Sequence, residues 1–165
     1  MGVKKRSELS LSRILKEKYI KLDLKEENKK KLLSELVELI AQSGRLKDKK
    51  VFLNALYKRE KLGSTGIGNG VAIPHTKSAE VKDFILAFAR RDEGVDFGAL
   101  DGEKTFLFFV LASPEVDVGN HLKILAQISR LVKDKFTVEY LKKVKTKKEI
   151  LKIISNFEMQ SISPV

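Results

Sequence analysis

The chain of 165 residues contains no cysteine and no tryptophan, and it has only three prolines and two histidines. Without cysteine it forms no disulfide and offers no thiolate for catalysis or metal binding. Its longest useful apolar run, Phe106 to Ala112, is far shorter than the roughly 20 residues that a helix needs to span a bilayer. The Lys-rich start, Met1 to Arg6, leads into a polar stretch rather than an apolar signal core. We therefore expect a soluble, cytoplasmic protein.

An excess of positive charge is the most conspicuous property of the composition. Lysine and arginine number 33 against 22 acidic residues, for a net charge of +11. The lysines are scattered through 29–31, 47–50 and 142–148, with few aromatic residues between them and no known nucleic-acid-binding motif. Such runs are typical of solvated helix faces, so we expect no nucleic-acid partner.

Length and periodicity favour one α/β domain over residues 1–165. Helical spacing predicts helices over 26–43, 49–62, 121–133, 137–143 and 147–156, with a short one within 10–19. In the second of these, Val51, Phe52, Ala55, Leu56 and Leu62 are expected to face inward. Strands are predicted at 19–24 as an edge strand, 71–73, 84–89 and 105–112, the last as a buried central strand. This order indicates a sheet covered by helices.

The densest cluster of unusual residues runs from Gly63 to His75, Gly-Ser-Thr-Gly-Ile-Gly-Asn-Gly-Val-Ala-Ile-Pro-His. Its glycines permit backbone angles that other residues avoid and let main-chain N–H groups approach an anion. Pro74 stiffens the support of His75, whose neutral ring has one nitrogen free to attack phosphorus while the other is held by a hydrogen bond. The pattern is compatible with a phosphorylated histidine. It is equally compatible with a Gly-rich turn that enters a strand, with His75 as an ordinary loop residue.

The second histidine, His121, follows a loop and cap segment and is expected in the first turn of a helix. Free N–H groups and the positive end of the helix dipole favour an anion there and disfavour a charged imidazole. A neutral His121 could then donate a hydrogen bond to a phosphoryl oxygen. The alternative is a histidine that packs at the edge of the apolar stripe formed by Leu125, Ile128 and Val132.

The run from Arg59 to His75 resembles the signature of the enzyme IIA domains of the bacterial phosphoenolpyruvate-dependent sugar phosphotransferase system, of the fructose/mannitol/nitrogen-regulatory type. Gly94 to Gly102, the strand from Thr105 to Ala112, and His121-Leu-Lys-Ile-Leu-Ala are similar to that family in the same order. The resemblance covers about residues 8–157. It implies a mixed central β-sheet flanked by helices on both sides.

The resemblance assigns roles to particular residues. It implies that His75 carries the phosphoryl group on Nε2, that His121 is the second active-site histidine, and that Arg59 neutralises the transferring group. Candidate phosphate-binding positions in the loop are Ser64, Thr65, Gly66, Gly68, Asn69 and Gly70, although the two hydroxyls could equally cap the turn and Asn69 could be only a turn residue. Glu60 is expected to be a structural partner.

By the same resemblance, the protein would take the group from the phosphohistidine of the carrier HPr and pass it to a cysteine of a separate enzyme IIB for sugar uptake, with the membrane enzyme IIC involved indirectly. No metal or other cofactor is expected. The alternative is a nitrogen-regulatory IIA protein, whose phosphorylation state controls binding to other proteins. Many family members have glycine after the Pro-His pair, whereas this chain has Thr76, which puts its partner preference in doubt.

Overall fold

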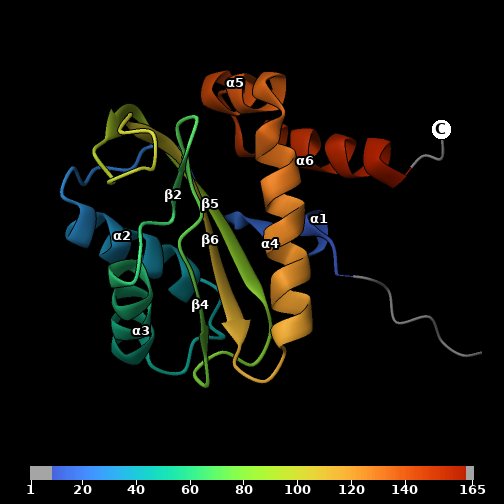
Figure 1. Ribbon diagram of the computed structural model, residues 1–165. Helices are drawn as coiled ribbons and strands as arrows, with labels where there is room; N and C mark the ends of the chain where they lie inside the picture. The colour runs from blue at the N-terminus through green and yellow to red at the C-terminus, as the bar shows by residue number, and fades with distance from the viewer. Residues whose placement is uncertain (1–8, 163–165) are drawn as a thin grey trace, which may run out of the picture.

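In the computed structural model, which describes residues 9–162, a mixed β-sheet lies between two groups of helices (Figure 1). The strands are β1 (Leu15–Lys21), β2 (Gly66–Gly68), β3 (Val71–Ala72), β4 (His75–Ser78), β5 (Ile85–Val95) and β6 (Thr105–Pro114). The helices are α1 (Leu11–Ile14), α2 (Lys29–Ala41), α3 (Lys49–Lys61), α4 (Val118–Lys133), α5 (Lys135–Lys143) and α6 (Lys147–Ile162). The segment Met1 to Arg6 lies outside the described residues.

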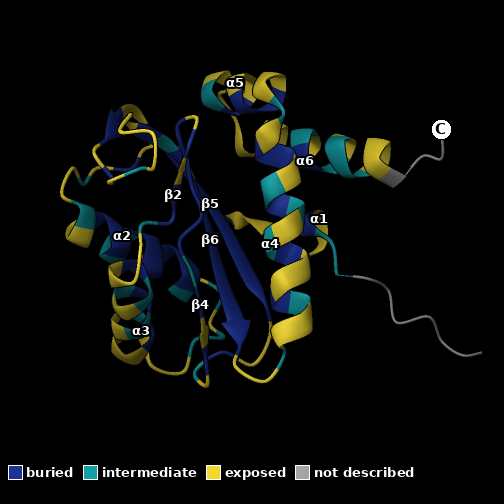
Figure 2. Cartoon of the chain, in the orientation of Figure 1, coloured by how far each residue is buried: buried dark blue, intermediate teal, exposed yellow. Residues whose placement is uncertain are grey.

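The two long strands β5 and β6 pair antiparallel at the centre of the sheet, whose order is β1-β5-β6-β3-β2. β1 runs parallel to β5, while β3 and β4 follow one another along the other edge of β6, both parallel to it. Helices cover both faces, so most side chains of β5 and β6 are buried (Figure 2). Burial on both faces explains why β6 reads as a continuous apolar run.

α2 and α3 lie on one side of the sheet, and α4 and α6 lie on the other (Figure 1). The predicted architecture, a mixed sheet flanked by helices on both sides, is confirmed. Each main helix begins at a side-chain cap, with Asn28, Asp48 and Asp117 accepting from backbone N–H groups at the starts of α2, α3 and α4. Within residues 9–162, no helix is both long and apolar enough to cross a bilayer.

The helix predicted within residues 10–19 is wrong beyond its first turn. α1 ends at Ile14, and the chain then extends into β1, which is an edge strand as predicted but begins earlier, at Leu15. The carboxylate of Glu158 accepts hydrogen bonds from the N–H groups of Leu11 at 2.8 Å and Ser12 at 2.9 Å. The Glu158 cap stabilises the single turn of α1, whereas pairing with β5, a strand far along the chain, overrides the local helical preference beyond Ile14.

Two residues expected to face inward from α3 are instead exposed, Val51 at 47% and Leu62 at 86%. The buried stripe of α3 is narrower than predicted and consists of Phe52, Leu56 and Glu60, at successive four-residue intervals. The last of these is a carboxylate. Glu60 therefore continues the apolar stripe into the interior at the end of the helix, next to the segment that follows it.

The strands β2 and β4 were not predicted, because neither has an apolar pattern. β4 contains His75, Thr76, Lys77 and Ser78, and it is a strand because it pairs with β6 from Leu111 to Pro114. β2 pairs with β3 in a tight hairpin through Asn69. Both strands depend on long-range backbone pairing, which short sequence windows do not report.

Candidate active site

His75 is the first residue of β4 and lies beside the central strand β6, opposite Leu111. The carbonyl oxygen of Pro74 accepts a hydrogen bond from the N–H of Leu111 at 3.0 Å, which fixes the backbone just before the imidazole. Nδ1 of His75 lies 2.6 Å from the carbonyl oxygen of Ile73. Because a carbonyl oxygen can only accept, Nδ1 carries the proton and Nε2 of the neutral ring keeps its lone pair.

His121 approaches the same point from the start of α4. It is buried near the start of α4, a helix that begins at Val118, three residues before the predicted start. Its ring centroid lies 5.6 Å from that of His75, with the two planes inclined at 49°. Nδ1 of His121 lies 2.7 Å from the hydroxyl oxygen of Ser113, a fully buried residue of β6. The structure thus brings together two histidines separated by 46 positions, each held through Nδ1.

Ser113 was not singled out in the sequence. It pairs with Lys77 of β4 and fixes the orientation of the His121 ring. The only local signal is that a small hydroxyl residue follows an otherwise apolar strand, and that signal is too common to indicate a functional residue by itself.

Burial is the main cause of lowered pKa values at both histidines. For His75, burial lowers the pKa from its usual value, the Ile73 carbonyl opposes this, and the charge of Arg59 lowers it further. For His121, the pKa is lowered to about 4, mainly by burial and further by repulsion from the charge of Lys77 and from that of His75 when it is protonated. His121 is therefore neutral at pH 7, as its position near a helix N-terminus predicted.

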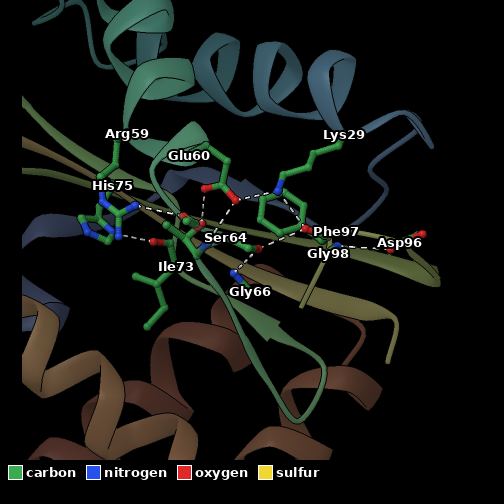
Figure 3. Close-up of polar contacts among 12 residues, drawn as sticks. Lys29, Arg59, Glu60, Ser64, Gly66, Ile73, His75, Asp96, Phe97 and Gly98 are labelled. Carbon is green, nitrogen blue, oxygen red and sulfur yellow. Dashed lines mark hydrogen bonds and ion pairs between the residues drawn. The ribbon is translucent and has the colours of Figure 1, made fainter. Parts of the chain in front are cut away.

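Arg59 lies in the last turn of α3, as predicted, and its guanidinium is beside His75 (Figure 3). Nη1 donates a hydrogen bond to the carbonyl oxygen of Gly63 at 3.0 Å. α3 packs against β4, so the end of this helix meets the strand that carries His75. The arrangement brings a cation to the imidazole and holds it there through a neutral carbonyl, the partner of Nη1.

Ser64, which is labelled in Figure 3, and its neighbour Thr65 both have hydrogen-bond partners within the fold. The Ser64 hydroxyl donates to the carbonyl oxygen of Phe97 at 3.2 Å and accepts from the N–H of Gly66 at 3.1 Å. Thr65 is buried and donates through its hydroxyl at 2.6 Å and its N–H at 3.0 Å to the two carboxylate oxygens of Glu60. These bonds favour the capping alternative for both hydroxyls and agree with the structural role expected of Glu60.

The glycine segment runs away from His75 into the β2–β3 hairpin. Asn69, at the turn, has a φ of 55° and donates its N–H to Asp101 at 3.0 Å. A Cβ on Gly66 would lie 2.9 Å from Cα of Ala99, so a close backbone approach requires glycine here. Gly70 precedes His75 by five residues of extended chain, about 16 Å. Phosphate binding by Gly66, Gly68, Asn69 and Gly70 stays a prediction, while chain packing accounts for Gly66 and Asn69.

The sequence model of the family "Phosphoenolpyruvate-dependent sugar phosphotransferase system, EIIA 2" matches residues 13–157. The chain belongs to this family. The match agrees closely with the resemblance over about residues 8–157, and it covers every element from β1 to most of α6.

Relatives of the EIIA family include proteins of two kinds. The chain is 32% identical over 150 residues to the fructose-specific EIIABC component of Bacillus subtilis, covering 91% of this chain but only 24% of that longer protein. It is 38% identical to the solved nitrogen regulatory protein IIA-Ntr of Neisseria meningitidis, with a TM-score of 0.82, covering 87% of this chain and 97% of that one.

The fold also matches the mannitol enzyme IIA of Escherichia coli in its complex with phosphorylated enzyme IIB. The TM-score is 0.73 at 21% identity, covering 86% of this chain and 99% of that one. At this identity the likeness concerns the fold alone. The relatives thus include both a fructose-specific component and a nitrogen regulatory protein, and family membership by itself does not select between these two kinds.

The surroundings of His75 and His121 differ from those of a metal site. Among residues 9–162, no group of three or more histidine, cysteine, aspartate or glutamate side chains is placed to hold a metal ion. The groups gathered at His75 are instead a second imidazole, a guanidinium and backbone carbonyls. This set is suited to holding an anion against a nucleophilic nitrogen.

Proposed function

We propose that this EIIA protein is a phosphocarrier that accepts a phosphoryl group on Nε2 of His75 and donates it to a cysteine of an enzyme IIB. The observation that carries the proposal is the 2.6 Å contact between Nδ1 of His75 and the Ile73 carbonyl oxygen. This contact fixes the tautomer in which Nε2 is the nucleophile. It also holds the ring in one orientation, as in-line transfer requires.

The proposed step is a displacement at phosphorus. The lone pair of His75 Nε2 forms a new N–P bond while the N–P bond of the donor phosphohistidine breaks, and the electron pair of that bond stays with the donor nitrogen. Nδ1–H keeps its proton and its bond to the Ile73 carbonyl, which stabilises the positive charge that develops on the ring. In the second step a thiolate of enzyme IIB attacks the same phosphorus, and Nε2 leaves with its electron pair.

His121 and Arg59 supply the electrostatic stabilisation. A neutral His121 that accepts the Ser113 hydroxyl proton at Nδ1 carries its own proton on Nε2. Its ring lies 5.6 Å from that of His75, so this Nε2–H is proposed to donate to a phosphoryl oxygen. The Arg59 guanidinium adds a full positive charge from the end of α3. Phosphoryl transfer depends largely on such preorganised donors, and removing one typically costs about 10²- to 10³-fold in rate.

Exposed apolar side chains near these residues favour a protein as donor and acceptor. Leu62, which is 86% exposed, follows the helix end that carries Arg59. Val116, at 94%, and Leu122, at 59%, lie on either side of the start of α4. Apolar groups at the edge of a partly open reactive site suit weak, transient docking of another protein. The net charge of +11 favours partner proteins with acidic docking surfaces.

The decisive experiment is intact-mass spectrometry after incubation with phosphoenolpyruvate, enzyme I and HPr. We expect one acid-labile phosphoryl group on the wild type and none on His75→Ala. A known enzyme IIA labelled in parallel controls for the donors. If the control is labelled and this protein is not, the phosphocarrier function is excluded.

A nitrogen-regulatory role is the second candidate, favoured by the 38% identity to the Neisseria meningitidis IIA-Ntr over nearly the whole length of that protein. Both roles predict phosphorylation of His75, so the two are separated by the acceptor. Incubation of the phosphorylated protein with a fructose-type enzyme IIB should drain the label within seconds to minutes if the protein supplies sugar transport. Label that persists on His75 while a control enzyme IIA is drained favours the regulatory role.

A further inference from the structure

A charged network extends from the site to a second helix. The carboxylate of Glu60 is buried, with only 5% of its side chain exposed. It accepts two hydrogen bonds from Thr65 and forms an ion pair of 2.7 Å with Nζ of Lys29, the first residue of α2. Figure 3 shows Glu60 between Lys29 on one side and Arg59 and His75 on the other. A buried carboxylate next to a phosphoryl site requires an explanation, because its charge opposes that of the incoming group.

Lys29 is held in place by more than the ion pair. Its Nζ donates to the carbonyl oxygen of Phe97 at 2.9 Å and lies 4.3 Å from the centroid of the Phe97 ring, which is fully buried. The Ser64 hydroxyl donates to the same carbonyl. The ammonium therefore joins α2, the end of α3 and the β5–β6 connection at one point. A lysine that only keeps a helix surface hydrated would not contact a buried carboxylate, a backbone carbonyl and an aromatic ring at once.

The contacts of Glu60 also affect the position of the Arg59 guanidinium. Glu60 fixes Thr65 through two hydrogen bonds, and this closes the short segment between them. Within that segment, the Gly63 carbonyl accepts from the Arg59 guanidinium at 3.0 Å. The position of the guanidinium beside His75 thus depends on a loop whose far end is held by Glu60.

Besides holding the Glu60 carboxylate in place, the positive charge of Lys29 offsets its negative charge. A phosphoryl group on His75 adds about two negative charges. An uncompensated Glu60 carboxylate nearby would repel it, and the interaction is strong because partly buried charges are poorly screened. The charge of Glu60 also acts to raise the pKa of His75, against the effect of burial and of Arg59. With Lys29 2.7 Å away, the carboxylate keeps its hydrogen bonds while most of its field is cancelled.

We infer that Lys29 is a positioning residue of the phosphoryl site: it holds and neutralises the Glu60 carboxylate, which anchors the loop that places Arg59 beside His75. The inference rests on the proposed phosphocarrier function. It assigns a role in phosphoryl transfer to a residue 46 positions before the nucleophile and on a different helix.

The test compares Lys29→Met, Glu60→Gln and the double variant with wild type and with Lys31→Met, which removes an exposed lysine from the same helix turn. Two quantities are measured: the pKa of His75 by NMR in the unphosphorylated protein, and the equilibrium constant for phosphoryl exchange with phosphorylated HPr. We expect Lys29→Met to raise the pKa of His75 and to shift the exchange about fivefold toward HPr. In the double variant the neutral amide removes the uncompensated charge, so the pKa of His75 should return to near the wild-type value. The exchange should recover only in part, because an amide offers Thr65 one acceptor oxygen where the carboxylate offers two.

Lys31→Met should leave both quantities unchanged. If Lys29→Met behaves like Lys31→Met in a folded protein, the inference is overturned. If the pKa of His75 in the double variant stays as high as in Lys29→Met, Lys29 does not act by neutralising Glu60 and the inference is again wrong. A wild type that takes no phosphoryl group from HPr refutes the proposed function as well, so the two failures are distinguishable.

Discussion

The imidazole rings of His75 and His121 lie 5.6 Å apart, and each is anchored through Nδ1 to a partner that is not itself titratable. His75 is held by the carbonyl of Ile73, and His121 is held by the hydroxyl of Ser113. The Nε2 atoms are therefore the nitrogens available for chemistry on both rings. A carbonyl anchor leaves a nucleophile at His75, whereas a hydroxyl anchor permits a donor at His121.

Ser113→Ala removes the hydroxyl that holds Nδ1 of His121 and leaves His75 and Arg59 in place. We expect the rate of phosphoryl acceptance to fall about tenfold, because a ring without its hydrogen bond populates other orientations and tautomers. Rapid-quench transfer from phosphorylated HPr measures this rate. Ser129→Ala, on the same helix as His121, is the matched control and should be close to wild type. An unchanged rate in Ser113→Ala would show that the anchor has no part in transfer.

Arg59 is expected to act through its planar, bidentate guanidinium rather than through charge alone. Arg59→Met should lower the transfer rate by about 10²-fold, and Arg59→Lys should recover only a small part of that loss. Lys61→Met removes an exposed cation from the same helical turn and should have little effect. Full activity in Arg59→Lys would contradict a role for the fork geometry and leave only a general electrostatic effect.

The rate of phosphoryl acceptance should depend on the protonation of His75. Because its pKa is lowered by burial, the nucleophilic neutral form predominates at pH 7, and the rate should fall only as the pH drops below the usual histidine value of about 6.5. The measurement is the single-turnover rate from pH 5 to 8, with enzyme I and HPr pre-equilibrated separately. A midpoint above about 6.5 would mean that the imidazolium is stabilised in the folded protein, which is contrary to this prediction.

Folding stability should decrease in acid because of His121. Its pKa is about 4 in the folded protein and about 6.5 in the unfolded chain, so between these values the unfolded state binds the extra proton. Stability from this group is complete above about pH 6.5 and is lost as the pH falls toward 4, by a total of about 3 kcal/mol. Denaturant unfolding of wild type and His121→Gln across this range measures it. Equal slopes for the two proteins would exclude His121 as the cause.

Alanine substitutions at Gly66 and Gly63 compare a glycine that close packing requires with one that has open space around it. Gly66→Ala places a Cβ 2.9 Å from the backbone of Ala99 and should cost about 1–3 kcal/mol of stability, whereas nothing lies within 4 Å of a Cβ at Gly63. Thermal unfolding of the two variants measures the difference. A similar melting temperature for both would show that the close approach of Gly66 to Ala99 is relaxed easily.

The residues of the candidate site were predictable to different degrees. His75, His121 and Arg59 could be named from a local motif and two resembling segments, because each belongs to a short stretch of distinctive residue types. Ser113 and Lys29 could not be found in this way. Both are ordinary residues in their own segments, and their significance arises from contacts with residues far along the chain, the 2.7 Å bonds to His121 and Glu60.

By itself, the sequence determined the α/β class, the long helices, the buried central strand and the identity of the two histidines. Those features follow from periodicity and residue type, which act over a few neighbouring positions. Only the tertiary structure decided that β4 is a strand, that β1 begins at Leu15, that Glu60 is buried, and that the glycine segment leads away from His75. Each of these depends on backbone pairing or ion pairing between distant segments, and such contacts are formed only when the whole chain has folded.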